Sequence, residues 1–143
     1  MLIERIVREK GNDVATIRAD APVAAAVAEL RRWNVGALVV TGESGPLEGI
    51  VSERDIVRAI ADGLNALEQP VGAIMSTEVV TCDRHATVEE IMRLMTDKRI
   101  RHVPIVEGGA LVGIVSIGDV VKNRLGELET ETRSLVDYIT AGR

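Results

Sequence analysis

The sequence has almost no aromatic side chains: its 143 residues include no Phe, one Trp and one Tyr. Proteins that bind single-stranded nucleic acids stack the bases on aromatic rings, so this chain lacks the means for that mode of binding. The net charge of -5 points the same way, because a phosphate backbone requires a basic surface. Composition therefore predicts a protein with no nucleic-acid partner.

Long apolar runs are also missing, and none approaches the ~18 residues that a membrane-spanning helix needs. The chain opens on residues 1–5, MLIER, which carry charge too early for a signal peptide. The single cysteine, Cys82, cannot form an internal disulfide, which is typical of a reducing compartment. We therefore expect a cytoplasmic protein that does not bind a membrane, with Cys82 as a small buried residue.

Catalytic and metal-binding patterns are absent from the sequence as well. The two histidines, His85 and His102, have no acidic or thiol partner at a spacing typical of a metal site. No nucleophile is paired with a base, and there is neither a Walker loop nor a dinucleotide-binding fingerprint. These absences predict a protein without catalytic residues, metal or catalytic cofactor.

The chain does contain an internal repeat, most visible in residues 49–55, GIVSERD, and residues 113–119, GIVSIGD. Each copy is an apolar, strand-like run that ends in a serine and leads into an amphipathic helical pattern. The serines occupy N-cap positions, and the aspartates three residues later fall in the first helical turn. A strand end that meets a helix N-terminus presents free N–H groups, so it is a natural place for a phosphate.

The repeat extends over most of the chain, with a predicted order of β-α-β-β-α in each copy. The first copy is expected to contain a strand at 14–17, a helix at 22–33, strands at 37–41 and 47–52 around a turn at 43–45, and a helix at 53–63. The second is expected to contain a helical turn at 70–75, a strand at 79–82, a helix at 87–98, strands at 102–106 and 110–116, and a long final helix. A further helix is expected at 2–10, and residues 65–69 are expected to link the copies.

These elements predict an α/β (α+β) fold of two repeats packed by pseudo-twofold symmetry, since neither repeat alone covers both faces of its sheet. The expected divisions are an N-terminal helix at 1–13, repeats at 14–68 and 69–128, and a C-terminal helical extension at 129–143. In the last helix, residues 121, 125, 128, 132, 135 and 139 recur at steps of four and three, and all but Thr132 are apolar. This seam either packs on its own domain or meets a partner chain.

The repeated pattern resembles a tandem pair of cystathionine-β-synthase (CBS) domains, a Bateman module. Residues 49–55 and 113–119 resemble the family's closing strand and helix start, and residues 100–106, IRHVPIV, resemble its middle strand. The likeness covers about residues 14–126 and is strongest to small stand-alone bacterial CBS-pair proteins with an extra helix at each end.

The resemblance implies two clefts between the halves that hold adenosine-containing ligands. In the family, the helix-start aspartate holds the ribose, the serine lies near ribose or phosphate, the opening strand touches the base, and basic residues of the other repeat reach the phosphates. The implied first cleft uses Thr16, Ile17, Ser52 and Asp55, and receives Arg101 or His102. Arg54 is a third candidate for contact with its phosphate. The implied second cleft uses Thr81, Cys82, Ser116 and Asp119, and receives only Gly36 and Ala37; Pro104, in the middle strand, completes the candidates.

Each candidate also has a purely structural interpretation. Asp55 complements the helix dipole whether or not a ligand is present. Arg101 and His102 are consecutive, and strand alternation sends them to opposite faces, so at most one side chain would face a given cleft unless the strand bends. The structural interpretation makes them a solvated edge residue and a histidine at the rim of the core, and it makes Arg54 a solvated helix residue.

The leading hypothesis is a non-enzymatic, homodimeric sensor that binds AMP, ADP, ATP or NAD(H) and regulates another protein, with the first cleft binding phosphorylated ligands better than the second. The alternative is a protein-interaction or dimerisation module with vestigial clefts. A third hypothesis is an enzyme, because CBS pairs occur inside IMP dehydrogenase, but this chain has no room for its ~250-residue barrel.

Overall fold

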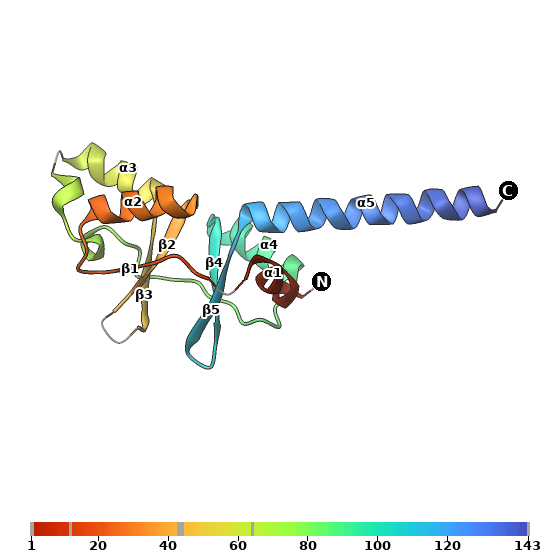
Figure 1. Cartoon of the computed structure of the whole chain (residues 1–143), viewed down its shortest axis with the longest axis horizontal. Helices are drawn as coiled ribbons and strands as arrows, with labels where there is room; N and C mark the ends of the chain where they lie inside the picture. Colours follow the sequence, from red (N-terminus) through yellow and green to blue (C-terminus); the bar gives the residue numbers. More distant parts are fainter. Residues whose placement is uncertain (1, 12, 43–44, 64, 143) are drawn as a thin grey trace.

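The computed structural model describes residues 2–11, 13–42, 45–63 and 65–142. Figure 1 shows two small units side by side, each with a sheet and flanking helices, and a long helix that projects away from the second unit. This arrangement confirms the predicted pair of repeats. The predicted turn at 43–45 falls in part on residues 43 and 44, which lie outside the described residues.

The first unit is built on a three-stranded sheet. Its elements are β1 (Thr16–Arg18), α2 (Val23–Trp33), β2 (Ala37–Thr41), β3 (Leu47–Ser52), α3 (Glu53–Asp62) and the short 3-10 turns η1 (Ala66–Glu68) and η2 (Val71–Ala73). The strand order is β1-β2-β3, with β1 parallel and β3 antiparallel to β2. Its core includes Leu38, Val40, Val51 and also Val71, although the sequence division assigned residue 71 to the second repeat.

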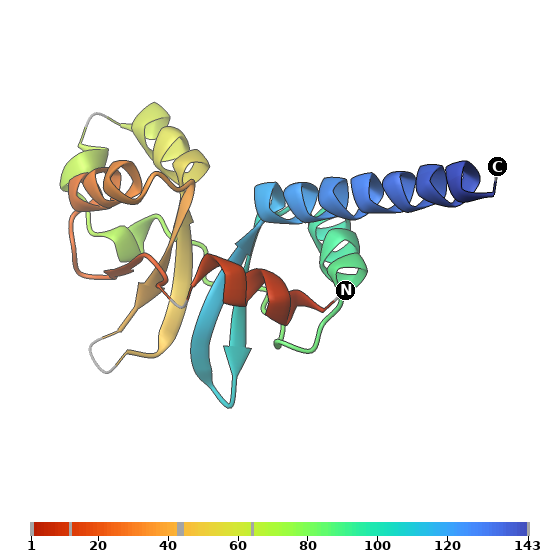
Figure 2. The same cartoon turned by 45° about the vertical axis from the view of Figure 1, so that its right-hand side comes forward.

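The second unit joins the two ends of the chain. Its elements are α1 (Ile3–Lys10), α4 (Val88–Lys98), β4 (His102–Glu107), β5 (Ala110–Ser116) and α5 (Ile117–Ala141), with β4 and β5 antiparallel. Helix α1 lies across the β4–β5 hairpin (Figure 2) and contributes Ile3, Ile6 and Val7 to the core of this unit. The first helix of the sequence therefore packs on the repeat that is furthest from it along the chain.

The strand predicted at 79–82 is wrong, because only Cys82 forms a bridge, to Ile105 of β4. In the first repeat the N–H of Val39 donates to the carbonyl of Ala15 at 3.1 Å. Pro104 occupies the position equivalent to Val39, and proline has no N–H to donate. The second sheet therefore loses the hydrogen bond that would hold the opening strand.

Two smaller differences concern the ends of elements. Strand β1 begins at Thr16 rather than residue 14, and Pro22 is the N-cap of α2 rather than its first helical residue. The other predicted helices and strands are observed within one or two residues of their expected ends. Helix α5 is 25 residues long, and its residues 129–141 are exposed in the described chain, so this part of the seam does not pack on its own domain. Among the described residues, no helix is both long and apolar enough to cross a membrane.

Candidate functional site

The two repeated motifs have the same local geometry. The Ser52 backbone N–H donates to Oδ2 of Asp55 at 2.8 Å, its hydroxyl donates to the same oxygen at 3.0 Å, and the Asp55 N–H donates back to the Ser52 hydroxyl at 3.3 Å. Ser116 and Asp119 repeat these three bonds at 2.8, 2.9 and 3.2 Å. The N-cap and first-turn predictions are thus confirmed, and each pair forms a capping box.

The first motif opens into a cavity of about 390 Å³ between the two repeats. The first repeat contributes Ser52, Arg54 and Asp55, and the second contributes Arg101 and His102. The remaining lining residues are Gly36, Ala37, Ile50, Glu53, Arg58, Ser76, Glu78, Val79, Val80, Arg99 and Ile100. A cavity of this size is in the range of small-molecule sites. The structure thus gathers five of the predicted residues of the first cleft.

Both Arg101 and His102 line this cavity, which strand alternation did not predict. The alternation fails because Arg101 lies in a bend before β4, and β4 begins only at His102. The Arg101 carbonyl accepts the Ile117 N–H at 2.8 Å, and the Gly36 carbonyl accepts the Glu53 N–H at 3.0 Å in the first repeat. Each strand start is thereby tied to the start of the helix that follows the motif.

Thr16 and Ile17 lie away from the cavity, in β1, where Ile17 is part of the core of the first unit. The segment 76–80 lines the cavity in their place. Ser76 holds this segment against β3, since the N–H of Ile50 donates to the Ser76 carbonyl at 3.0 Å and the Ser76 N–H donates to the Ile50 carbonyl at 2.9 Å. The base-contacting strand expected from the same repeat is therefore replaced by the segment that enters the other repeat.

The residues expected in a second cleft are divided between two places, although Ser116 and Asp119 stay together in their capping box. Thr81 and Cys82 line a separate hollow with Asp83 and His85, whereas Asp119 faces a groove between α1 and α5. Gly36 and Ala37 line the first cavity instead of the second. Pro104 is buried in β4. Cys82 is only partly buried, and this burial, followed by the nearby Asp83 and Glu90, raises the pKa of its thiol.

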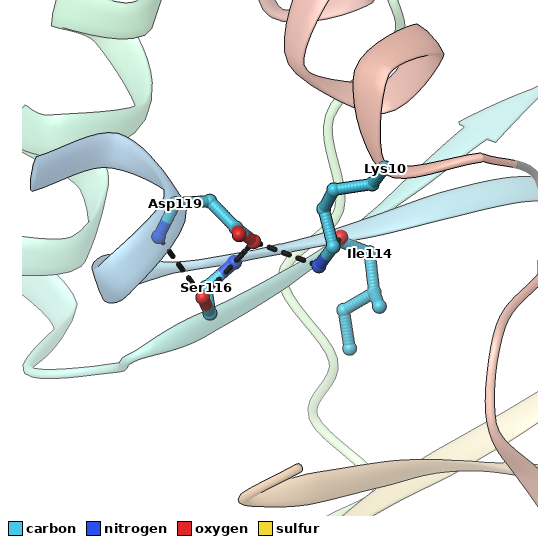
Figure 3. Close-up of polar contacts among 4 residues, drawn as sticks. All are labelled: Lys10, Ile114, Ser116 and Asp119. Atoms are coloured by element: carbon cyan, nitrogen blue, oxygen red, sulfur yellow. Dashed lines mark hydrogen bonds and ion pairs between the residues drawn. The ribbon is translucent and has the colours of Figure 1, made fainter. Parts of the chain in front are cut away.

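The Asp119 carboxylate has a partner that the sequence did not reveal (Figure 3). The ammonium of Lys10, at the end of α1, donates to Oδ2 of Asp119 at 2.7 Å and to the carbonyl of Ile114 at 2.9 Å. Burial alone would raise the pKa of Asp119, but the hydrogen bonds from Lys10 and Ser116 outweigh it and hold the pKa below its usual value. Asp119 is therefore ionised and paired at neutral pH.

The charge of the first cavity favours an anion. Four arginines and three carboxylates line it: Arg54, Arg58, Arg99 and Arg101, against Glu53, Asp55 and Glu78. Burial lowers the pKa of His102, and Lys10 lowers it further against the opposing effects of Asp119 and Glu53. His102 is therefore neutral near pH 7, and Arg101 is the cation that the β4 side of the cavity offers.

The lowered pKa of His102 predicts a pH-dependent stability. The unfolded chain protonates this histidine at higher pH than the folded chain does, so acidification favours unfolding. We expect the free energy of unfolding to fall as the pH drops below about 6.5, and His102→Gln to flatten this dependence. Thermal unfolding between about pH 5 and about pH 7 measures it, with the exposed His85→Gln as the control. An equally steep pH dependence in His102→Gln would contradict the prediction.

Among the described residues, no group of three or more His, Cys, Asp or Glu side chains is arranged to hold a metal ion. Asp55 uses Oδ2 for its capping bonds, and its second oxygen accepts none from the described residues. An ionised carboxylate with a free oxygen, facing arginines across about 390 Å³, can hold a ligand that carries both hydroxyls and an anionic group.

Comparison with known proteins gives consistent results. The family model of the CBS domain matches residues 4–62 and 71–126. The mitochondrial CBS domain-containing protein CBSX3 of Arabidopsis thaliana is 42% identical over 122 residues, which are 82% of this chain and 59% of that protein. The chain thus spans less than two thirds of the length of this relative.

Two solved structures are similar over most of the chain. The CBS-domain containing protein ATU1752 from Agrobacterium tumefaciens has a TM-score of 0.83 and 42% identity, covering 86% of this chain and 92% of that one. The CBS domain pair of protein MJ0100, solved in complex with 5′-methylthioadenosine and S-adenosyl-L-methionine, has a TM-score of 0.80 and 26% identity, covering 89% and 98%.

Proposed function

Because the chain belongs to the CBS-domain family and carries two copies of the domain, we propose that it is a non-enzymatic regulatory protein that binds an adenine nucleotide. The ligand is AMP, ADP, ATP or NAD(H), and its site is the cavity around Asp55. The observation that carries this proposal is the convergence of Ser52 and Asp55 from one repeat with Arg101 from the other on a single cavity.

The lining of the cavity suits each part of such a ligand. The free oxygen of Asp55 accepts hydrogen bonds from the ribose hydroxyls, and these bonds are charge-assisted. Arg54 and Arg101 pair with the phosphates. Val79, Val80 and Ile100 provide an apolar wall for the base. The MJ0100 pair, which was solved with two adenosine-containing ligands, supports the nucleoside part, and the four arginines here favour a phosphorylated one.

Regulation then follows from where the ligand sits. A nucleotide that contacts both repeats binds one relative orientation of them more tightly than others, and it shifts the population toward that orientation. A partner protein that also prefers this orientation is coupled to the nucleotide by the same free energy. No bond in the ligand has to be made or broken, so the proposal requires no catalytic group.

We also place the function in a cytoplasmic homodimer. The seam of α5 presents Val121, Leu125, Leu128, Leu135 and Ile139, each 42% to 62% exposed in the isolated chain. An apolar stripe at heptad spacing along a projecting helix is suited to pairing with a second copy, and twofold dimers are the commonest closed assemblies. The proposed cytoplasmic location rests on the single cysteine alone.

Native mass spectrometry of the purified protein, titrated with AMP, tests both parts. We expect dimers that retain or take up nucleotide. In thermal unfolding we expect nucleotide to raise the melting temperature, because a ligand at 100 times its dissociation constant stabilises the folded protein by about 2.7 kcal/mol. Neither binding nor a melting shift with millimolar AMP, ADP, ATP, NAD or NADH would refute the sensor and leave the alternative, an interaction module that acts through the exposed seam of α5. A protein that is only monomeric at micromolar concentration would refute the dimer alone.

A further inference from the structure

The ends of the two motifs, at Asp55 and at Asp119, differ in their contact with a cation from helix α1. Asp55 and Asp119 share the same capping bonds to within 0.1 Å. Only Asp119 also accepts a hydrogen bond from a cation, the ammonium of Lys10 at 2.7 Å. In the described chain, no side-chain cation reaches Asp55 in the same way.

The reason lies in what covers the edge of each closing strand. In the first repeat the backbone of Ser76 pairs with both polar groups of Ile50, and the chain then continues along the cavity. Ile114 occupies the position equivalent to Ile50, and there its carbonyl accepts the Lys10 ammonium instead. Helix α1 occupies the place that the segment at Ser76 has in the first repeat, with Val7 packed closely over Gly113.

Several effects favour this contact. Lys10 is the last residue of α1 and Asp119 lies in the first turn of α5, so each charge complements the dipole of its own helix. The two side chains are 37% and 22% exposed, so water screens the pair less than a surface ion pair. Figure 3 shows the lysine reaching from the end of α1 to the motif, between the aspartate and the strand carbonyl.

We propose that the ammonium of Lys10 blocks ligand binding at the end of the second motif, where Ser116 and Asp119 lie. Its ammonium binds Oδ2 of Asp119, the oxygen that also accepts the capping bonds, and thereby neutralises the carboxylate that would otherwise make charge-assisted hydrogen bonds to the hydroxyls of an adenine ligand. The resting chain therefore binds such a ligand only at Asp55. The second site becomes available when Lys10 leaves Asp119. This inference rests on the proposed function for the chemical class of the ligand, but the contact between α1 and Asp119 can be tested without any ligand.

The test compares Lys10→Met, which keeps an unbranched side chain but removes the charge, with Arg8→Met on the same helix. Arg8 is an exposed residue that pairs only with Glu4 in the described chain, so it controls for the loss of a cation from α1. Calorimetric titration with AMP and with adenosine is expected to give a single equivalent per chain for wild type and Arg8→Met. Lys10→Met is expected to bind a second equivalent, and Lys10→Gln provides a replicate if Lys10→Met folds poorly.

Each outcome has a defined meaning. Two equivalents in wild type, or a single equivalent in a folded Lys10→Met protein, would overturn the inference and leave the proposed function intact. No binding by wild type with binding by Lys10→Met would support the blocking of Asp119 by Lys10 and refute the first cavity as the site. No binding by either would overturn both. Independently of any ligand, the α1 amides are expected to exchange hydrogen faster in Lys10→Met than in wild type, and at the wild-type rate in Arg8→Met. Equal exchange rates in Lys10→Met and wild type would show that the Lys10 contact does not stabilise the packing of α1.

Discussion

Replacing Arg101 by alanine is expected to weaken AMP binding by about one to two orders of magnitude and adenosine binding much less. Arg101 is the cation that the second repeat brings to the cavity from its β4 side, where the neighbouring His102 is neutral. A charge-assisted hydrogen bond to phosphate contributes roughly 1.5–3 kcal/mol, and each 1.4 kcal/mol is about a tenfold change in affinity. Adenosine has no phosphate, so it does not lose this bond.

Isothermal titration calorimetry with both ligands measures the difference. Arg93→Ala, an exposed arginine on α4 that does not line the cavity, is the matched control for the loss of charge. Asp55→Ala is expected to weaken both ligands, because both carry the ribose hydroxyls. Asp119→Ala breaks an equivalent capping box together with the pair to Lys10, so it sets an upper bound on the stability cost of losing the box. If Asp119→Ala abolishes AMP binding and Asp55→Ala leaves it intact, the site has been assigned to the wrong motif.

Replacing Gly49 by alanine is expected to lower the free energy of unfolding by about 1–3 kcal/mol, the usual cost of overpacking a buried site. A Cβ at this position would lie 2.6 Å from the backbone oxygen of Ser76 and 2.8 Å from the sulfur of Met75. The clash is with backbone, which cannot turn aside as a flexible side chain does. Because Ser76 begins the segment that lines the cavity, AMP binding is expected to weaken together with stability.

Urea unfolding and calorimetry on the same protein samples measure both effects. Gly63→Ala is the matched control, because its φ of 178° is extended and a Cβ there would meet no atom within 4 Å. Gly113→Ala is expected to cost less than Gly49→Ala, since its nearest contact at 2.9 Å is a methyl group of Val7. Equal stability of the Gly49→Ala and Gly63→Ala proteins would show that the contact with Ser76 can relax.

Local signals in the sequence were enough to predict most of the elements. The serine and aspartate of each motif form a capping box within four consecutive residues, so no distant partner has to be known. The helix predicted at 87–98 begins with a capping box of the same kind, between Thr87 and Glu90. The strand predicted at 79–82 failed because its hydrogen bonds depend on residue 104, which follows more than twenty positions later and is a proline.

The candidate site was also only partly predictable from the sequence. The repeat and the resemblance placed Ser52 and Asp55 opposite Arg101 and His102, and the structure gathers these four residues at one cavity. The choice of base-contacting segment did not follow from the sequence, because either opening segment has an apolar pattern. It is decided by the pairing of Ser76 with Ile50, which brings residues 76–80 to the cavity and leaves Thr16 and Ile17 in β1.

The sequence by itself determined the two repeats, their helix caps, the balance of charge and the two motif ends, since these depend on residue identity and short spacing. Only the tertiary structure decided that the two ends are unequal. Lys10 and Asp119 are 109 positions apart, and no pattern along the chain connects them. They meet because the apolar face of α1, with Ile3, Ile6 and Val7, is buried in the second unit rather than the first, and this burial carries the lysine to the aspartate.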